Sequence, residues 1–391
     1  MDEAATSRAA DAARWDATSH VARARKLIPA RPPSAEGRGL DRVLTRVGGL
    51  VDGLACRALK PLFAYSTHRV IDAAGAGPLR TTWEPHAVDA ARDPAPFFPR
   101  PAAPLPAVRQ VAILPGGWIE DVTFPSAYGG GRDTAAQLAR DFPANQTARA
   151  RWYRHRTPGR LAVVCLHPWG AGAGPLSDAL FWAPRLYARG LDVCLYVQPY
   201  HGPRAPRRAR LLEILHPTAD VTRANEAFLQ TVWEARALLA WHAEVAGRGG
   251  GLLGMSLGAY AAALAASVAP ELEFVVPIAP IADLAAIIWT WGAGSPVQAR
   301  LAARGMDFDR FCSLMAIHSP LRHPAPALPL ERLLIVAGRG DGFVPRSHTE
   351  ALHEHWGRPA LEWLPGGHVL QFGRHRLLGR LETFLGRVAA A

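Results

Sequence analysis

The stretch Leu252-Leu253-Gly254-Met255-Ser256-Leu257-Gly258 decides the fold expected for this sequence of 391 residues. It joins an apolar, strand-like run to a helix-like segment rich in Ala and Gly. A serine between two glycines at such a junction is typical of a sharp turn, in which the serine backbone is strained and its neighbours are crowded. The five-residue pattern alone is weak evidence, so its surroundings must carry the interpretation.

The chain on both sides of this turn alternates strand-like and helix-like segments. Such alternation indicates a mostly parallel sheet with crossover helices. A long segment from 280 to 330 contains helical patches and several aromatic residues, and we interpret it as a helical lid. The expected strands are Val122–Phe124, Arg151–Tyr153, Leu161–Leu166, Leu191–Val197, Gly251–Met255, Phe274–Ile278, Leu333–Val336 and Leu361–Trp363.

The N-terminal part of the chain differs in composition from the rest. Residues 1–39 are rich in Ala, Arg and Asp without a sustained apolar stripe, which predicts a flexible tail. Residues 40–105 predict a helical extension followed by a Pro-rich linker, because apolar residues recur at helical spacing from Leu40 to Leu54. We expect this helix to dock on the main domain. The alternative is a basic amphipathic helix that contacts an anionic membrane or a lipid particle.

The charge balance raises the question of acidic partners. Lys+Arg 44 against Asp+Glu 33 gives a formal net charge of +11. Only Lys26 and Lys60 are lysines, and the arginines are spread along the whole chain without a recognition motif. We therefore expect no nucleic-acid partner, although the Arg-rich stretch from Arg204 to Arg210 remains a local candidate.

Cysteine usage and targeting signals favour an ordinary intracellular protein. The four cysteines are scattered and form no CxxC pair, which predicts buried free thiols. No apolar run follows Met1, so no secretory signal is visible. The apolar stretch from Ala259 to Trp289 is interrupted by prolines and acidic residues, which favours a buried helix and strand over a membrane span. A soluble cytoplasmic protein is the resulting expectation.

Two polar side chains further along the chain are candidate partners of Ser256. A serine hydroxyl needs a base that removes its proton and donors that stabilise the oxyanion. Asp341 lies in a Gly-rich turn after a strand-like run, and His368 lies in the loop after the last expected strand. Asp283 is an alternative acid, because it also follows an expected strand.

The elbow and the order Ser256, Asp341, His368 resemble the α/β-hydrolase superfamily, from about Val122 to the end of the chain. The chain is similar to its serine esterases and lipases and to abhydrolase-domain proteins. The resemblance implies a mostly parallel central sheet with helices on both faces, and a catalytic domain over 106–391 with a lid at about 280–330. It also implies that Ser256 is the nucleophile, His368 the general base and Asp341 the orienting acid.

The resemblance further implies an oxyanion hole built from two backbone N–H groups. One comes from the residue after the nucleophile, Leu257, and the other from the loop His167-Pro168-Trp169-Gly170-Ala171-Gly172. Pro168 has no N–H, so Trp169 is the expected second donor. We expect His167 to brace this loop rather than to act in catalysis.

Three more residues are candidate substrate-binding residues: Met255, beside the nucleophile, and Tyr200 and His201. The last two belong to the segment Gln198–Arg204, which resembles a Pro-Tyr-His-Gly-x-Arg segment of related proteins. This segment either lines the acyl pocket or holds the loop, and we prefer the second role. His353-Glu354-His355 lacks the i, i+4 spacing of a helical zinc site, so we expect no metal and no cofactor.

Together these features predict a serine hydrolase that cleaves a carboxylic ester or thioester of a small-molecule or lipid-like substrate. Activity should rise as the histidine deprotonates, near pH ~6.5 to 7. A serine nucleophile argues against epoxide hydrolase and haloalkane dehalogenase chemistry, which uses a carboxylate. Two alternatives remain: an acyltransferase with the same triad, and a non-catalytic binding protein that keeps the fold.

Overall fold

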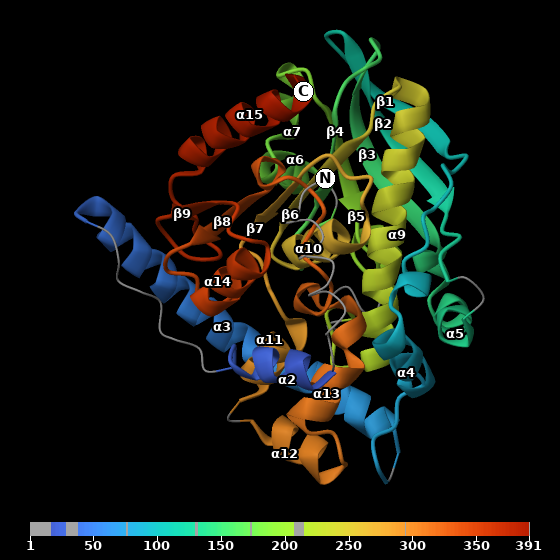
Figure 1. Ribbon diagram of the computed structural model, residues 1–391, viewed down its shortest axis with the longest axis vertical. Coiled ribbons are helices and arrows are strands. Elements are labelled where there is room, and N and C mark those ends of the chain that lie inside the picture. Colours follow the sequence, from blue (N-terminus) through green and yellow to red (C-terminus); the bar gives the residue numbers. More distant parts are fainter. Residues whose placement is uncertain are drawn as a thin grey trace, which may run out of the picture.

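The computed structural model describes residues 17–28, 38–75, 77–129, 132–172, 174–206, 215–293 and 295–390. Within these residues, one nine-stranded sheet has the order β1-β2-β3-β5-β4-β6-β7-β8-β9 (Figure 1). The pairs β1–β2, β2–β3 and β3–β5 are antiparallel. The pairs β5–β4, β4–β6, β6–β7, β7–β8 and β8–β9 are parallel. Their bounds are β1 Ala107–Leu114, β2 Gly117–Pro125, β3 Thr147–His155, β4 Ala162–Leu166, β5 Asp192–Val197, β6 Gly250–Met255, β7 Val275–Ile278, β8 Leu334–Gly338 and β9 Ala360–Leu364.

Helices cover both faces of this sheet. One face packs against α9 (Val221–Ala246), α10 (Leu257–Val268) and α14 (Arg346–His355). The other packs against α6 (Pro175–Leu180), α7 (Ala183–Ala188) and α15 (Arg374–Ala390). The central parallel strands are buried throughout, because both of their faces are covered.

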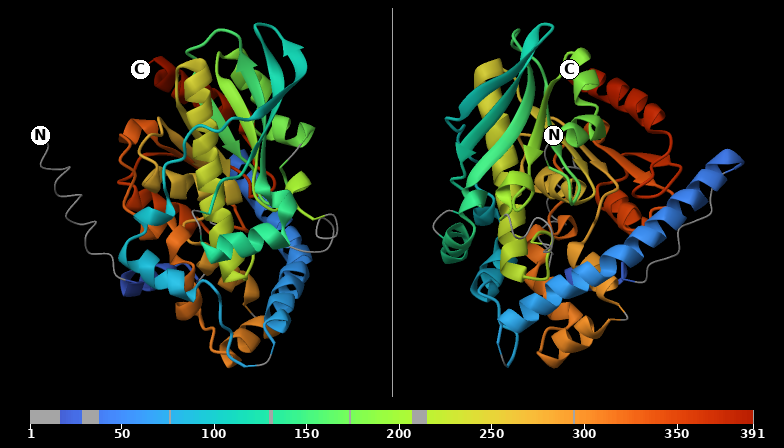
Figure 2. Two further views of the ribbon diagram at one scale, coloured as in Figure 1. Left: turned by 90° about the vertical axis from the view of Figure 1, so that its right-hand side faces the viewer. Right: turned by 180° about the vertical axis from the view of Figure 1, so that it is seen from behind.

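The remaining helices gather mainly at one end of the sheet (Figures 1 and 2). The α-helices are α2 Ala17–Arg25, α3 Leu40–Ala73, α4 Glu84–Arg92, α5 Asp133–Asp141, α11 Leu284–Gly292, α12 Pro296–Ala303 and α13 Phe308–Leu314. Short 3-10 helices are η1 Ala95–Phe97, η2 Pro143–Gln146, η3 Gly202–Arg204, η4 Ala316–His318, η5 Pro320–Arg322 and η6 Leu330–Arg332.

The expected sheet and fold class are confirmed, and all eight expected strands are present. Strand β1 was not expected. It is an edge strand whose side chains are mostly exposed, and it forms a hairpin with β2. Its sequence mixes Val and Ile with Arg and Gln, and exposure removes the apolar pattern by which buried strands are recognised. The helices α11, α12 and α13 occupy the segment expected to be a lid.

The prediction of a flexible tail is wrong for residues 17–28. They form α2 and the turn that follows it, and α2 contacts α11 and α13. His20, Ala24 and Leu27 are buried, at a spacing that places them on one helical face. Three residues are too few to produce a recognisable helical periodicity in the sequence. The other residues of 1–37 lie outside the described part of the chain.

The predicted docking of the N-terminal helix is confirmed, but over residues 40–54 the docked face is not the apolar one. Along α3, the buried residues are Thr45, Gly48, Asp52 and Ile71. The expected apolar stripe instead points largely to solvent. No helix among the described residues is long and apolar enough to cross a membrane.

Candidate active site

Ser256 stands at the sharp turn between β6 and α10. Its backbone has φ 55° and ψ −112°, a conformation that a residue with a side chain adopts only under strain. The serine N–H donates to the carbonyl of Ile278 at 2.8 Å, and its carbonyl accepts from Tyr260 N at 3.0 Å. These bonds on both sides hold the turn, so the hydroxyl is presented from rigid backbone.

The two glycines of the elbow are needed for space, as the sequence predicted. A Cβ at Gly254 would collide with the carbonyl of Gly258. A Cβ at Gly258 would collide with the carbonyl of Leu166, and it would approach His167 O to 2.9 Å. The start of α10 is therefore packed directly against the loop that follows β4.

Ser256, His368 and Asp341 form one continuous chain of hydrogen bonds. The serine Oγ lies 2.8 Å from Nε2 of His368, and Nδ1 of the same ring lies 2.7 Å from Oδ2 of Asp341. A neutral imidazole with its proton on Nδ1 donates to the carboxylate and accepts from the hydroxyl. The geometry is that of an activated nucleophile, its base and an orienting acid.

Asp341 is fixed in its turn, whereas the alternative acid has another role. Oδ1 of Asp341 accepts from the backbone N–H groups of Phe343 and Val344, at 2.9 and 2.8 Å. Asp283 caps the start of α11 through Ala286 N and accepts from the hydroxyl of Ser319. The imidazole of His368 therefore meets Asp341 and not Asp283.

The environment of His368 acts on its pKa in two directions. Burial lowers the pKa, but the charge of Asp341, the hydrogen bond to it and the charge of Asp52 all raise it, and the net result is above the ordinary 6.5. The ring also stacks on Phe343, with centroids 5.0 Å apart and an interplanar angle of 24°. The imidazolium form is thus stabilised by two carboxylates.

The loop after β4 is held by His167. Its Nδ1 lies 2.8 Å from Pro168 O, and its Nε2 accepts the backbone N–H of Gln198 at 3.0 Å. Burial is the largest factor that lowers the pKa of His167, to about 3. A neutral imidazole whose two ring nitrogens are both hydrogen-bonded braces the loop, as expected, and an oxyanion role for Trp169 and Leu257 remains a prediction.

Comparisons with known proteins agree with this fold. The family model described as alpha/beta hydrolase domain containing 18 matches residues 130–297. Among solved structures, acetyl xylan esterase 1 from Thermoanaerobacterium sp. JW/SL YS485 has a TM-score of 0.53 and 14% identity over 81% of this chain and 97% of its own. The acetyl xylan esterase from Paenibacillus sp. R4 has a TM-score of 0.50 and 16% identity over 81% and 98%.

The chain has the α/β-hydrolase fold. Two curated relatives, the uncharacterized proteins Rv2627c and MT2702 of Mycobacterium tuberculosis, are each 34% identical over 239 residues. The match covers 58% of this chain and 54% of theirs, so the chain spans about half the length of these relatives.

A further residue, which the sequence did not suggest, contacts the loops of His368 and Asp341. Asp52 of α3 is fully buried, and its Oδ2 accepts from His368 N at 2.5 Å and from Gly342 N at 2.9 Å. Its Oδ1 accepts from Val369 N at 3.0 Å. Burial raises the pKa of Asp52, and these three N–H donors oppose that shift. One carboxylate thus joins the loop of the base to the loop of the acid.

Small residues let α3 come this close. A Cβ at Gly48 would collide with the backbone at Gly367, and one at Gly342 would lie 2.9 Å from Cβ of Asp52. Only the tertiary structure reveals these approaches, because Asp52 and His368 are 316 positions apart. The sequence held no signal that singles out this Asp among the polar residues of the expected helix.

An aromatic row leads away from His368. Phe343, which stacks on His368, lies 5.3 Å from Trp291, measured between ring centroids. Trp291 in turn lies 4.8 Å from Phe63 of α3, which lies 5.4 Å from Trp169 of the loop after β4. Phe63 and Trp291 also line an apolar cavity of about 220 Å³. Helix α3 and the expected lid segment thus both contribute to this wall.

Tyr200 and His201 are held by packing and hydrogen bonds. Both are buried; Tyr200 packs edge-on against Phe142, and Nδ1 of His201 lies 2.9 Å from Pro199 O. Met255 is also buried, in the core on the α6, α7 and α15 side of the sheet. Substrate contact by these three residues remains a prediction.

The segment Gln198–Arg204 is anchored by Arg204, whose buried guanidinium pairs with Glu234 at 2.6 and 2.9 Å. Residues 207–210 of the Arg-rich stretch lie outside the described part.

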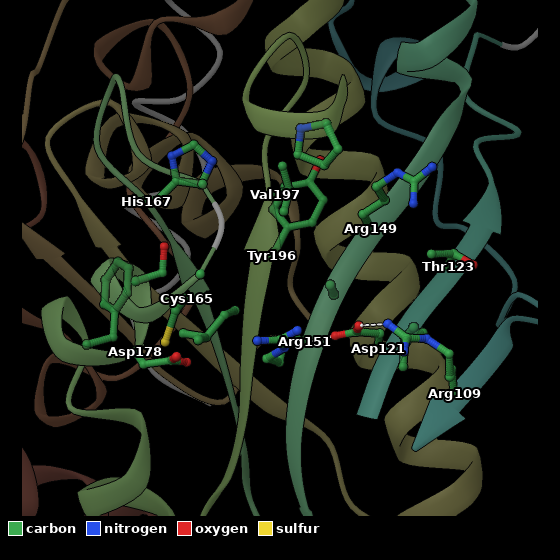
Figure 3. Close-up of a pocket in the computed structure, with 18 of the residues that line it drawn as sticks. Arg109, Asp121, Thr123, Arg149, Arg151, Cys165, His167, Asp178, Tyr196 and Val197 are labelled. Atoms are coloured by element: carbon green, nitrogen blue, oxygen red, sulfur yellow. Dashed lines mark hydrogen bonds and ion pairs between the residues drawn. The ribbon is translucent and has the colours of Figure 1, made fainter. Parts of the chain in front are cut away.

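A second hollow is lined in part by the loop after β4. It measures about 490 Å³ and is lined by strands β1 to β5 and by α6 (Figure 3). Asp121 at its floor pairs with Arg109 and Arg151 at 2.5 and 2.8 Å, so the carboxylate offsets much of the basic charge. His167 lines this hollow and Ser256 does not.

Among the described residues, one group of side chains has the spacing of a metal site. His20, Asp283 and Cys312 are buried, and their ligand atoms lie within 4.8 Å of one another. Asp283 is already committed to Ala286 N and Ser319 Oγ, and Nδ1 of His20 has no hydrogen-bond partner. Metal-bound imidazoles usually anchor their second nitrogen. We therefore interpret this cluster as a packing contact that holds α2 against the rest of the protein, and not as a metal site.

Proposed function

We propose that this protein is a serine hydrolase that cleaves carboxylic esters through an acyl-enzyme on Ser256. The observation that carries the proposal is the unbroken hydrogen-bond chain from Asp341 through His368 to Ser256 at a strained elbow. The fold neighbours are too distant in sequence to lend their substrates to this chain. The proposal therefore rests on the site itself.

In the proposed reaction, Nε2 of His368 takes the proton of Ser256 as Oγ attacks the ester carbonyl. The N–H groups of Leu257 and Trp169 hold the oxyanion, and their closeness is supported by the contact of Gly258 with the loop after β4. The imidazolium then protonates the departing alcohol. Water, deprotonated by His368, releases the acid and restores Ser256.

We propose that an apolar part of the ester lies along the aromatic row. Phe343, Trp291 and Phe63 extend from the imidazole of His368 toward the apolar cavity beside α3. Apolar and aromatic linings suit hydrophobic acyl or alkyl groups, with few polar atoms to set orientation. The cavity of about 220 Å³ favours esters with short or medium chains over bulky ones.

The test is hydrolysis of p-nitrophenyl esters of increasing chain length by the full chain and by Ser256→Ala. We expect turnover by the wild type that falls at least about 10³-fold in the variant. Ester turnover that survives Ser256→Ala unchanged would refute the proposal. Product analysis with an added alcohol separates hydrolysis from transfer, because a transferase forms the new ester in place of the free acid.

A further inference from the structure

The outer face of α3 carries an exposed apolar stripe. Relative exposures are 69% for Leu40, 55% for Val43, 41% for Val47, 70% for Leu50 and 64% for Leu54. These residues recur every three or four positions, which places them on one side of the helix, opposite the side that Thr45, Gly48 and Asp52 bury. Scattered exposed apolar residues are common, but five in one stripe mark a binding surface.

The stripe lies on the same turns of α3 that contact the proposed active site, but on the outer side of the helix. Asp52, on the opposite side of the same helix turns, accepts the backbone N–H groups of His368 and Val369. Val369 and Leu370, directly after His368, are themselves 53% and 39% exposed. The first turns of α3 project past the body of the molecule (Figures 1 and 2), so a flat surface can reach the stripe.

The charged side chains of α3 indicate which kind of surface binds the apolar stripe. From 40 to 60, the exposed charged side chains of α3 are Arg42, Arg46, Arg57 and Lys60, whereas the carboxylate of Asp52 is buried. The chain as a whole carries a formal charge of +11. Two copies meeting through this face would bring like charges together, which opposes self-association. An anionic surface is attracted by the same charges.

We propose that α3 docks this protein on anionic lipid, with the apolar stripe inserted among the acyl chains and the basic residues at the headgroups. Amphipathic helices bind in this way, and their affinity grows with inserted apolar area and with basic charge. Docking there places α3 between the lipid and the loop of His368 and Val369, which Asp52 holds on the other side of the helix. The proposal does not depend on the proposed hydrolase activity, since binding is measured without turnover.

The experiment is sedimentation of the full chain with phosphatidylcholine vesicles and with vesicles containing about one third phosphatidylglycerol. We expect binding to the anionic vesicles only. Leu50→Ser with Leu54→Ser should weaken it about tenfold or more. Leu105→Ser with Ile113→Ser is the matched control, because those residues are 95% and 70% exposed near the hairpin of β1. This control should bind like the wild type.

A second pair of variants tests the charge. Arg46→Gln and Arg57→Gln should each weaken anionic binding about fivefold and reduce its salt dependence. Thermal unfolding of every variant verifies that the fold is kept. Absence of vesicle binding, or equal binding by the stripe variant and the wild type, would overturn the proposal. So would a wild-type dimer that the stripe variant converts to a monomer, because the face would then belong to a second copy.

Discussion

Oδ2 of Asp52 accepts the backbone N–H of His368 at 2.5 Å, so a buried carboxylate on the N-terminal helix holds the loop that carries the proposed catalytic base. The same atom accepts from Gly342, next to Asp341, and thereby connects the two loops that must stay in register for the triad to form. Residues far outside the elbow and its partners are thus part of the site.

Asp52→Asn should lower kcat about 10- to 100-fold with little change in KM, because the amide group replaces one acceptor and the loop shifts. The substitution also removes a charge that raises the pKa of His368. The pH midpoint of kcat/KM, expected above 6.5 in the wild type because only neutral His368 is active, should therefore move to lower pH.

The matched control for Asp52 is Asp72→Asn on the same helix, whose side chain is 63% exposed and pairs with Arg300. It should leave kcat and the pH midpoint unchanged. An Asp52→Asn variant with a wild-type pH profile and a wild-type kcat would show that the buried carboxylate does not position the base.

Substitutions of the two candidate acids, Asp341 and Asp283, should differ clearly in their effect on kcat. Asp341→Asn should lower kcat about 10³- to 10⁴-fold, because the imidazole loses its orienting partner and the imidazolium loses its counter-charge. Asp283→Asn should retain activity, since Asn also caps helices and Asp283 makes no bond to His368. Steady-state kinetics on one ester decides, and equal losses in both variants would contradict the assignment.

Acid should unfold the protein well before its carboxylates titrate. Burial is the largest cause of the low pKa values of five buried histidines, about 3 for His167, His318 and His348 and about 4 for His201 and His323. Below about pH 6.5, the pKa of histidine in the unfolded chain, these side chains are protonated in the unfolded state but stay neutral in the folded state. The free energy of unfolding therefore falls as pH falls.

Between pH 7.5 and 5.5 each such histidine should remove about 1.4 kcal/mol, and together they should consume much of a typical domain stability of about 5–15 kcal/mol. Urea unfolding at these two pH values measures the loss. A free energy of unfolding that stays constant between them would contradict the buried, neutral state of these rings.

The elements nearest to the chemistry were the most predictable. Ser256 and Asp341 follow buried strands, whose continuous apolar runs are visible in the sequence. His368 follows β9, which is only partly buried, and it was found through the order of the three residues in the chain. The exposed edge strand β1 and the short helix α2 left weaker patterns. Asp52 and Phe63 were invisible as site residues, because nothing local distinguishes an Asp or a Phe whose partner lies hundreds of residues away.

The N-terminal helix illustrates this limit. Its apolar spacing correctly predicted a helix, and spacing alone favours docking through the apolar face. The helix docks instead through Thr45, Gly48 and Asp52, because glycine allows close approach and the carboxylate satisfies three N–H groups. Removing residues 1–105 would delete Asp52 and Phe63 with the stripe, so point variants are the appropriate test of each.

The most direct test of the central claim is the reaction of the full chain with a fluorophosphonate probe, followed by intact-mass and peptide analysis. We expect one adduct, on Ser256, formed in the wild type and in the control variant Ser177→Ala, whose buried hydroxyl has no hydrogen-bond partner. The adduct should be absent from Ser256→Ala. Labelling of Ser256→Ala at the wild-type rate, or no labelling of the wild type, would contradict the assignment of Ser256 as the nucleophile.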